Sequence, residues 1–236
     1  LGGVPVGSSA VIASTVPTDG ATTVNAGVLR AGAANVLPVG TALTVANAAT
    51  LDLNNQAQTI GSLAGVAGSA VTLGSAALTT GGNNSSTAFN GVISGTGSLV
   101  KTGTGTFTLG GANSYTGATN VNAGTLQAGA ANVLPSSTAV TAGNGATLAL
   151  ANLAQTIGSL AGAGAVTLGS GALTTGGNNT NTAFTGAILG SGSLVKTGTG
   201  VFAVSGANTY TGTTTVAQGT LSATAANALS AASAHT

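Results

Sequence analysis

Charged side chains are almost absent from this sequence of 236 residues, in which Asp, Glu, Lys and Arg together make up 2%. The cations are Arg30, Lys101 and Lys196, and the side-chain anions are Asp19 and Asp52. Because so few cations offer a polyanion nothing to bind, the composition predicts that nucleic acid is not a partner. The formal net charge of +1 also excludes disorder driven by charge repulsion.

Cysteine, methionine and tryptophan are missing, and the aromatic residues are limited to four Phe and two Tyr. The absence of cysteine excludes disulfides and fits an exported chain, although it fits a cytosolic chain nearly as well. No apolar run reaches the roughly 18 residues of a membrane-spanning helix, and the start LGGVPVGSS lacks the regions of a signal peptide. Both ends fall inside a repeat, so we expect this sequence to be a fragment of a longer chain.

A long internal repeat dominates what is present. The run AGVLRAGAANVLP at Ala26 returns as AGTLQAGAANVLP at Ala123, a spacing of 97 that becomes 95 further on. We therefore predict a single repeat array over residues 1–236, with internal repeats 26–122 and 123–217 and partial repeats 1–25 and 218–236. Its 40 glycines, with many Thr, Ser and Asn, disfavour helix, so we expect an all-β chain.

Every second residue is held nearly constant between the two copies, whereas the residues between them vary more. This two-residue period predicts strands with one constrained side, which we place in the interior. Shorter strands are expected around Leu51 and Leu53, Ile60 and Leu63, Val71 and Leu73, and from Phe89 to Ile93. The recurring positions in the first copy are Leu99, Lys101, Phe107, Leu109, Asn113 and Tyr115, and in the second Leu194, Lys196, Phe202, Val204, Asn208 and Tyr210.

The spacing of Leu29, Leu51 and Leu73, 22 residues each time, matches one turn of a three-sided β-solenoid. With about 4.8 Å between stacked strands, roughly 22 residues per turn predict on the order of ten turns and a rod about 50 Å long.

Two polar residues of the repeat need a special position. Asn113 and Asn208 suit a bend at which the side-chain amide satisfies backbone groups freed from the strand ladder. Lys101 and Lys196 alternate with the inner side, where an unpartnered ammonium is costly. Either each lysine emerges at a corner, or its stem packs inward and its head reaches water. We expect the corner.

The segments GSLVKTGTGTFTLGGANSYTGATNVNAGTL from Gly97 and GSLVKTGTGVFAVSGANTYTGTTTVAQGTL from Gly192 resemble the passenger-associated repeat of bacterial autotransporters. A degenerate trace near the start keeps GATTVNAGVL but has Val16 and Thr18 at the Asn and Tyr positions. The resemblance implies a right-handed parallel β-helix, an extracellular or bacterial cell-surface location, and membrane attachment only through a C-terminal barrel outside this sequence. It implies a scaffold for adhesion, autoaggregation, toxin or protease activity.

Catalytic and metal chemistry find little support in the sequence. Polysaccharide-cleaving β-helices need paired carboxylates, but Asp52 is expected to face solvent and Asp19 lies far from it in sequence. His235 has no Cys, His or acidic residue nearby with which to hold a metal. The glycine-rich segment GTGT at Gly103 precedes no helix that could supply a phosphate site. We predict no enzyme, no catalytic, cofactor-binding or metal-binding residues and no cofactor.

Three readings of function remain open. The first is a structural or adhesive surface module whose unpaired solenoid ends or edges drive self-association or fibre formation, with other cell-surface molecules as further partners. The second is ligand or ice binding by a flat face of Thr102, Thr104, Thr106 and Thr108. The third, which we favour least, is a polysaccharide-active enzyme. A row of recurring lysines that binds sugar sulfates or lipopolysaccharide has only two members.

Overall fold

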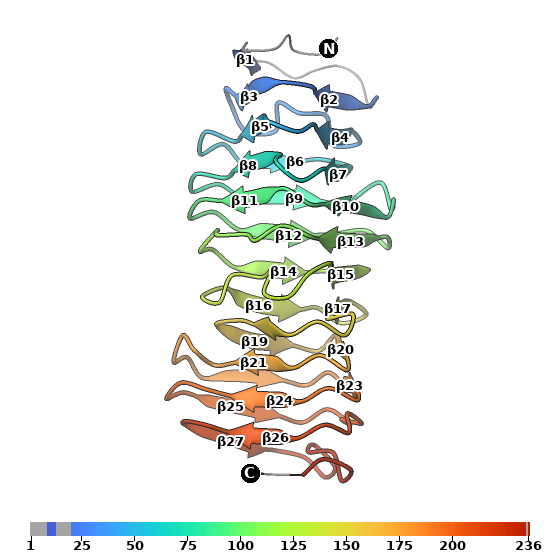
Figure 1. Ribbon diagram of the computed structural model, residues 1–236, viewed down its shortest axis with the longest axis vertical. Helices are drawn as coiled ribbons and strands as arrows, with labels where there is room; N and C mark the ends of the chain where they lie inside the picture. The colour runs from blue at the N-terminus through green and yellow to red at the C-terminus, as the bar shows by residue number, and fades with distance from the viewer. Residues whose placement is uncertain (1–8, 13–19, 235) are drawn as a thin grey trace. The chain divides into compact units, whose positions relative to one another are not determined.

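The computed structural model describes residues 9–12, 20–234 and 236. Its secondary structure consists of short strands, and these residues contain no helix. The chain divides into two compact units. The first ends at Ala118 and the second begins at Thr119. Figure 1 labels the strands, from blue in the first unit to red in the second.

The first unit folds into three sheets, each named here by its first strand in the chain. Strands visit them in rotation, so that β5, β6 and β7 lie in three different sheets, as do β8, β9 and β10. The β1 sheet contains β1 (Ser9–Ile12), β3 (Gly27–Ala31), β5 (Ala49–Asp52), β8 (Ala70–Thr72) and β11 (Val92–Ser94). The β2 sheet contains β2 (Thr22–Val24), β4 (Ala42–Val45), β7 (Ser62–Gly65), β10 (Thr87–Phe89) and β13 (Thr106–Leu109). The β6 sheet contains β6 (Gln58–Thr59), β9 (Leu78–Thr80) and β12 (Leu99–Lys101).

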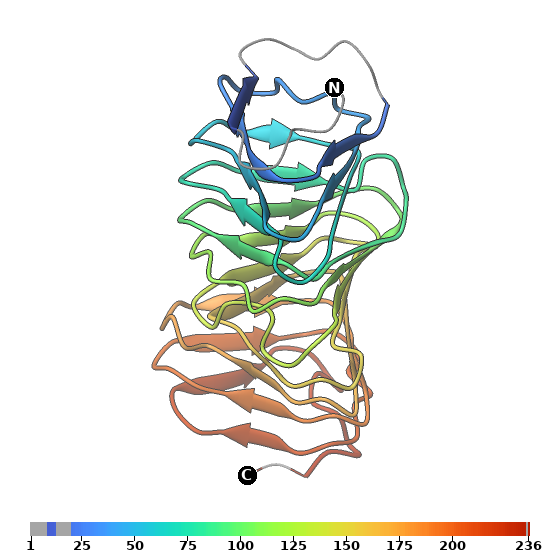
Figure 2. The same cartoon turned by 45° about the horizontal axis from the view of Figure 1, so that its top comes forward.

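The strands of the second unit follow the same plan and also fall into three sheets, each named here by its first strand in this unit, as the yellow to red turns of Figure 2 show. The β14 sheet contains β14 (Thr119–Val121), β16 (Ala139–Ala142), β19 (Ser159–Gly162), β22 (Thr182–Phe184), β25 (Val201–Val204) and β27 (Thr220–Ala223). The β15 sheet contains β15 (Thr125–Ala128), β17 (Thr147–Ala149), β20 (Ala165–Gly169) and β23 (Ile188–Gly190). The β18 sheet contains β18 (Gln155–Thr156), β21 (Leu173–Thr175), β24 (Leu194–Lys196) and β26 (Thr214–Val216).

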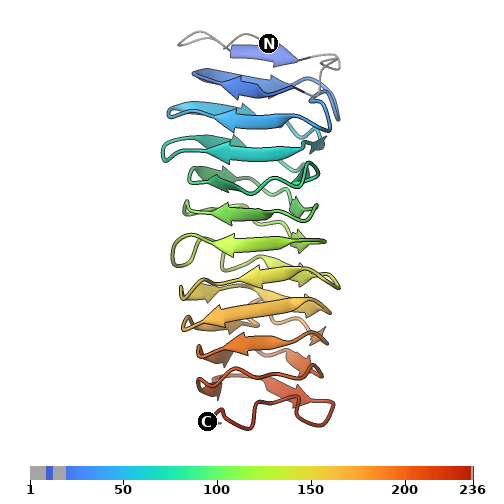
Figure 3. The same cartoon turned by 90° about the vertical axis from the view of Figure 1, so that its right-hand side faces the viewer.

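Neighbouring strands in each sheet run parallel and belong to successive turns, which Figure 3 shows as stacked arrows within each unit. Leu29 pairs with Leu51, 22 residues on, as predicted. Leu51, however, pairs with Val71 and not with Leu73. The predicted constant period was wrong because turns differ in the length of their corner loops. The prediction of an all-β parallel solenoid is confirmed, whereas the length of the whole rod stays a prediction.

Alternating side chains fill the inside of each turn. In β13, Phe107 and Leu109 are buried whereas Thr106 and Thr108 are half-buried, because successive strand residues point to opposite faces. The strand expected from Phe89 to Ile93 is interrupted by a corner, so that β10 and β11 belong to different sheets. The apolar pattern survives this break because the corner is short, which is why sequence periodicity could not reveal it.

Asparagine marks many of the corners. Asn54, Asn55 and Asn84 have positive φ angles of 50°, 62° and 63°, a backbone region that asparagine tolerates better than most residues. Their side chains also connect turns: Asn55 Oδ1 accepts a hydrogen bond of 2.9 Å from the amide of Ser75, and Asn84 Oδ1 one of 2.8 Å from the amide of Thr104. Asn55 and Asn84 therefore both shape their corners and bond them to the next turn.

Ala151 occupies the corner position that Asn54 holds in the first repeat, with a φ of 52°. An L-residue other than Gly or Asn pays about 1 kcal/mol or more there. We expect Ala151→Asn to raise the free energy of unfolding by about 0.5–1 kcal/mol, measured by urea titration. Ala149→Asn, within the extended strand β17, is the control and should give no gain. Equal effects of both substitutions would contradict the strain at Ala151.

Candidate functional site

The recurring lysines lie inside the solenoid. Lys196 is 0% exposed, and its Nζ donates hydrogen bonds to the carbonyl oxygens of Thr197, Gly198 (2.8 Å) and Gln218 (3.2 Å). The expectation that the lysine emerges at a corner was wrong, and so was the alternative that its head reaches water. Backbone carbonyls at the corner replace water as acceptors, which makes burial of the ammonium tolerable. Burial still lowers the pKa of Lys196 from its ordinary value, by desolvation.

Lys101 has the same environment in the first unit. It is 1% exposed, its Nζ donates to the carbonyls of Thr102 (2.6 Å) and Gly103 (2.9 Å), and desolvation lowers its pKa. On the neighbouring strands, Thr80 pairs with Lys101 and Thr175 with Lys196. The Oγ1 atoms of these two threonines are buried without a hydrogen-bond partner. In both repeats the lysine ammonium therefore donates hydrogen bonds to the corner carbonyls and not to the threonine hydroxyl.

The recurring asparagines are buried at a bend between strands. Asn113 Oδ1 accepts a 2.8 Å hydrogen bond from the amide of Ile93, and Asn208 Oδ1 accepts one of 2.7 Å from the amide of Ile188. The Nδ2 group of Asn208 also donates to the carbonyl of Ala228. The side chain of Asn208 thus bonds both the preceding and the following turn, where no strand ladder supplies partners.

A chain of hydroxyl groups follows Asn208. Tyr210 is fully buried, and its hydroxyl lies 2.6 Å from Thr214 Oγ1, which lies 2.8 Å from Ser233 Oγ. Ser233 in turn donates to the carbonyl of Gly212 at 2.6 Å. Desolvation raises the pKa of Tyr210, against the smaller opposing effect of these hydrogen bonds. The tyrosine is therefore a neutral structural group.

The other recurring positions form the apolar interior. Among the residues that the structure describes, each of these side chains is at most 2% exposed, and they are Leu99, Phe107, Leu109, Tyr115, Leu194, Phe202, Val204 and Tyr210. The four phenylalanines and two tyrosines are therefore all inside. None is left on the surface to stack on a sugar ring, which is how aromatic residues commonly contribute to ligand sites.

Two buried glutamines hold loops that sequence reasoning did not interpret. Gln155 Oε1 accepts hydrogen bonds from the amides of Val133 (3.0 Å) and Leu134 (3.3 Å), and its Nε2 donates to Ala130 (2.8 Å). Gln58 does the same for the loop before β4 in the first unit, with the amide of Leu37 at 3.1 Å. The only signal in the sequence was that both glutamines recur with the AANVLP segment.

Surface charge is confined to one ion pair in the described part of the chain, where Arg30 Nε lies 2.7 Å from Asp52 Oδ2. The 22-residue turn that pairs Leu29 with Leu51 also brings these charges together, which sequence reasoning missed. Asp19 and His235 lie outside the described residues. Within residues 9–12, 20–234 and 236, no group of three His, Cys, Asp or Glu residues could hold a metal ion. A strand, β13, begins directly after Gly103 and Gly105.

The expected flat threonine face does not form. Thr102 follows β12 of the β6 sheet, Thr104 lies in the corner, and Thr106 and Thr108 belong to β13 of the β2 sheet. The four hydroxyls therefore do not project from one surface, because the chain turns a corner between them. The prediction that these four threonines project together outward was wrong.

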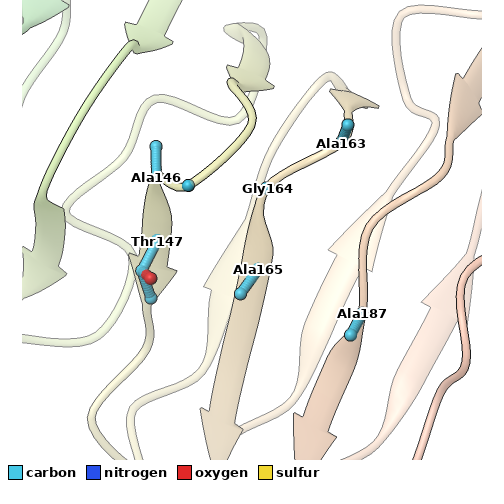
Figure 4. Close-up of a pocket in the computed structure, with 7 residues that line it drawn as sticks. Ala146, Thr147, Ala163, Gly164, Ala165 and Ala187 are labelled. Carbon is cyan, nitrogen blue, oxygen red and sulfur yellow. The ribbon is translucent and has the colours of Figure 1, made fainter.

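Shallow hollows occur where outward side chains are small. One, of about 270 Å³, lies over β17 and β20 of the second unit. In Figure 4 the side chains of Thr147, Ala165 and Ala187 follow one another across adjacent strands. Another, of about 260 Å³, lies over β10 and β13 of the first unit. Neither hollow is lined by a charged or aromatic side chain. No helix in the described part of the chain is long and apolar enough to cross a membrane.

Burial of both lysines has a direct consequence for proteolysis. Trypsin cleaves after Lys and Arg. We expect the native chain to be cleaved after Lys101 and Lys196 only when the whole chain unfolds. The unfolded molecules make up a fraction on the order of 10⁻³ or less. Arg30, whose side chain is 49% exposed, is the control site. Mass spectrometry of a time course would measure each cut. Cleavage of the native chain after the lysines as fast as in the urea-unfolded chain would contradict their burial.

Comparison with known proteins places these features in a family context. Residues 17–31, 99–128 and 194–223 match the family model of the passenger-associated-transport-repeat. Three segments of the chain are thus similar to the passenger-associated-transport-repeat. The second and third repeats contain both buried lysines, both asparagines and both tyrosines described above. The predicted resemblance to autotransporter passengers is confirmed.

A curated relative agrees with the repeat assignment. The sequence is 39% identical to the protein named Adhesin BmaC autotransporter of Brucella suis biovar 1 (strain 1330) over an alignment of 112 residues. This alignment covers 44% of the present chain. The matched part spans 3% of that protein's length. No solved structure matches the chain.

Proposed function

We propose that this chain is a non-catalytic, extracellular segment of an autotransporter-like bacterial surface protein, acting as an adhesive stalk. The supporting observation is that passenger-associated-transport repeats fold here into a parallel solenoid, in a chain similar to part of a named adhesin. Its recurring chemical groups are enclosed in that solenoid and serve to hold it together. What it offers to partners is therefore backbone shape and small, uncharged outward side chains.

The finer part of the proposal is self-association. On the outer face of the β14 sheet, Thr141 pairs with Ala161 and Ala183 pairs with Ala203. No charge on this row opposes the approach of a second copy, and the small side chains allow close contact. Association through such a surface depends little on salt, because screening acts only on charges.

Beads coated with the purified chain test both parts. We expect them to bind cultured epithelial cells and to clump with each other, and analytical ultracentrifugation to show oligomers at high protein concentration in both low and high salt. The variant Thr141→Lys with Ala183→Lys should abolish clumping by like-charge repulsion, since both side chains are exposed. Thr141→Ser with Ala183→Ser is the neutral control and should keep it.

Two results would overturn the proposal in separate ways. A strictly monomeric chain at high concentration removes self-association but leaves adhesion to cells. Beads that bind neither cells nor one another remove the adhesive function altogether.

A further inference from the structure

The acceptors of the Lys196 ammonium come from two different turns. The carbonyls of Thr197 and Gly198 belong to the corner directly after the lysine, whereas that of Gln218 lies 22 residues further on. Nζ has three N–H groups, and these three carbonyls are three acceptors. The hydrogen bonding of this buried cation is thus complete only when the following turn is in place.

Other buried polar groups of the same repeat also reach forward. Asn208 donates to the carbonyl of Ala228, 20 residues on, and Thr214 contacts Ser233, 19 residues on. Neutral groups such as these lose little if one bond is missing, compared with a buried charge. Among these residues, Lys196 is therefore the one whose hydrogen bonds matter most for the placement of the next turn.

We propose that Lys196 is a register latch, whose buried ammonium fixes the turn containing Gln218 on the turn containing Lys196. A slip of one residue would turn the inward side chains outward, which packing alone opposes, whereas a slip of two residues keeps the alternation of inward and outward side chains. Packing therefore distinguishes a two-residue slip less strongly than a one-residue slip. A charge that loses an acceptor in a dry interior distinguishes them strongly.

The direction of the ammonium supports a latch that acts forward. Thr175, the partner of Lys196 on the preceding turn, keeps its hydroxyl without a hydrogen bond. The ammonium of Lys196 therefore hydrogen-bonds its own corner and the following turn, and not the hydroxyl of Thr175. The described acidic residue, Asp52, belongs to the other unit and pairs with Arg30.

Acetylation of the native chain tests the latch without mutating Lys196. With acetic anhydride and mass spectrometry, we expect Lys196 to react at least about a hundredfold more slowly than a lysine introduced by Val195→Lys on the outer side of the same strand. As the urea concentration rises below the unfolding transition, the acetylation rate of Lys196 should increase in parallel with the amide exchange rate in β27 and not with that in β21. Reaction as fast as at position 195, or reaction that follows β21, would overturn the proposal.

Amide hydrogen exchange of Lys196→Met gives a second test, because methionine keeps much of the stem and removes the ammonium. We expect exchange in β26 and β27 to rise about tenfold to a hundredfold while β21 changes little. Leu194→Ala is the control: it removes packing on the same strand and should loosen β21 and β26 alike. Equal loosening of β21 and β26 in Lys196→Met, or no change in either, would mean that the lysine only fills space.

Discussion

Replacing Gly186 by alanine is expected to lower the free energy of unfolding by about 3 kcal/mol or more. A Cβ atom at Gly186 would overlap the carbonyl oxygen of Gly164 in the preceding turn. Two atoms cannot approach this closely, so the backbone of one turn must move and stretch hydrogen bonds such as that between Thr185 and Gly162, now 2.8 Å. Urea or thermal unfolding measures the loss, which corresponds to a drop in Tm of roughly 6–12 °C.

The matched control is Gly177→Ala in the same unit. Gly177 is exposed, and a Cβ there would meet nothing within 4 Å. We expect a change within about 0.5 kcal/mol. A comparable loss in both variants would show that backbone freedom, not the close approach of turns, is what Gly186 provides.

Replacing Gln155 by leucine is expected to cost about 2–4 kcal/mol. Leucine is of similar size but cannot accept hydrogen bonds from the amides of Val133 and Leu134 or donate to the carbonyl of Ala130. Removing one partner from buried polar groups costs more than the hydrogen bond itself contributed. Chemical unfolding gives the free-energy change, and hydrogen exchange should locate the loosening in the loop 130–138.

Gln127→Leu is the control for this substitution, since Gln127 is a half-buried residue in strand β15. It should leave exchange in the loop unchanged and alter stability by no more than about 0.5 kcal/mol. Loop exchange that is the same in Gln155→Leu as in the unchanged chain would contradict the role of the glutamine.

Much of the fold follows from local pattern. The alternation in TFTL and VFAV predicts strands with a buried side, and Phe107 and Val204 are buried accordingly. The repeat length predicts stacked turns, and Leu29 pairs with Leu51. These predictions succeed because a strand's side-chain period and a solenoid's turn length are both written along the chain.

Other features depend on where corners fall. Asn90 and Gly91 interrupt what reads as one strand from Phe89 to Ile93, and the corner after Lys101 separates Thr102 from Thr106. Side-chain alternation continues across such corners, so it cannot show that two strands belong to different sheets. This is why the prediction that the four threonines share one face was wrong.

The sequence by itself determined that this protein is a repetitive, nearly uncharged β-solenoid with passenger-type repeats, because composition, period and motif are local properties. Only the tertiary structure decided what the polar residues of the repeat do. Gln155 bonds the amide of Val133, 22 residues before it, and Lys196 takes one of its three acceptors from Gln218, 22 residues after it. The backbone groups of these partners carry no mark in the sequence. Burying a lysine in a dry interior is costly when its ammonium has no partner, but three carbonyl oxygens accept hydrogen bonds from the ammonium of Lys196.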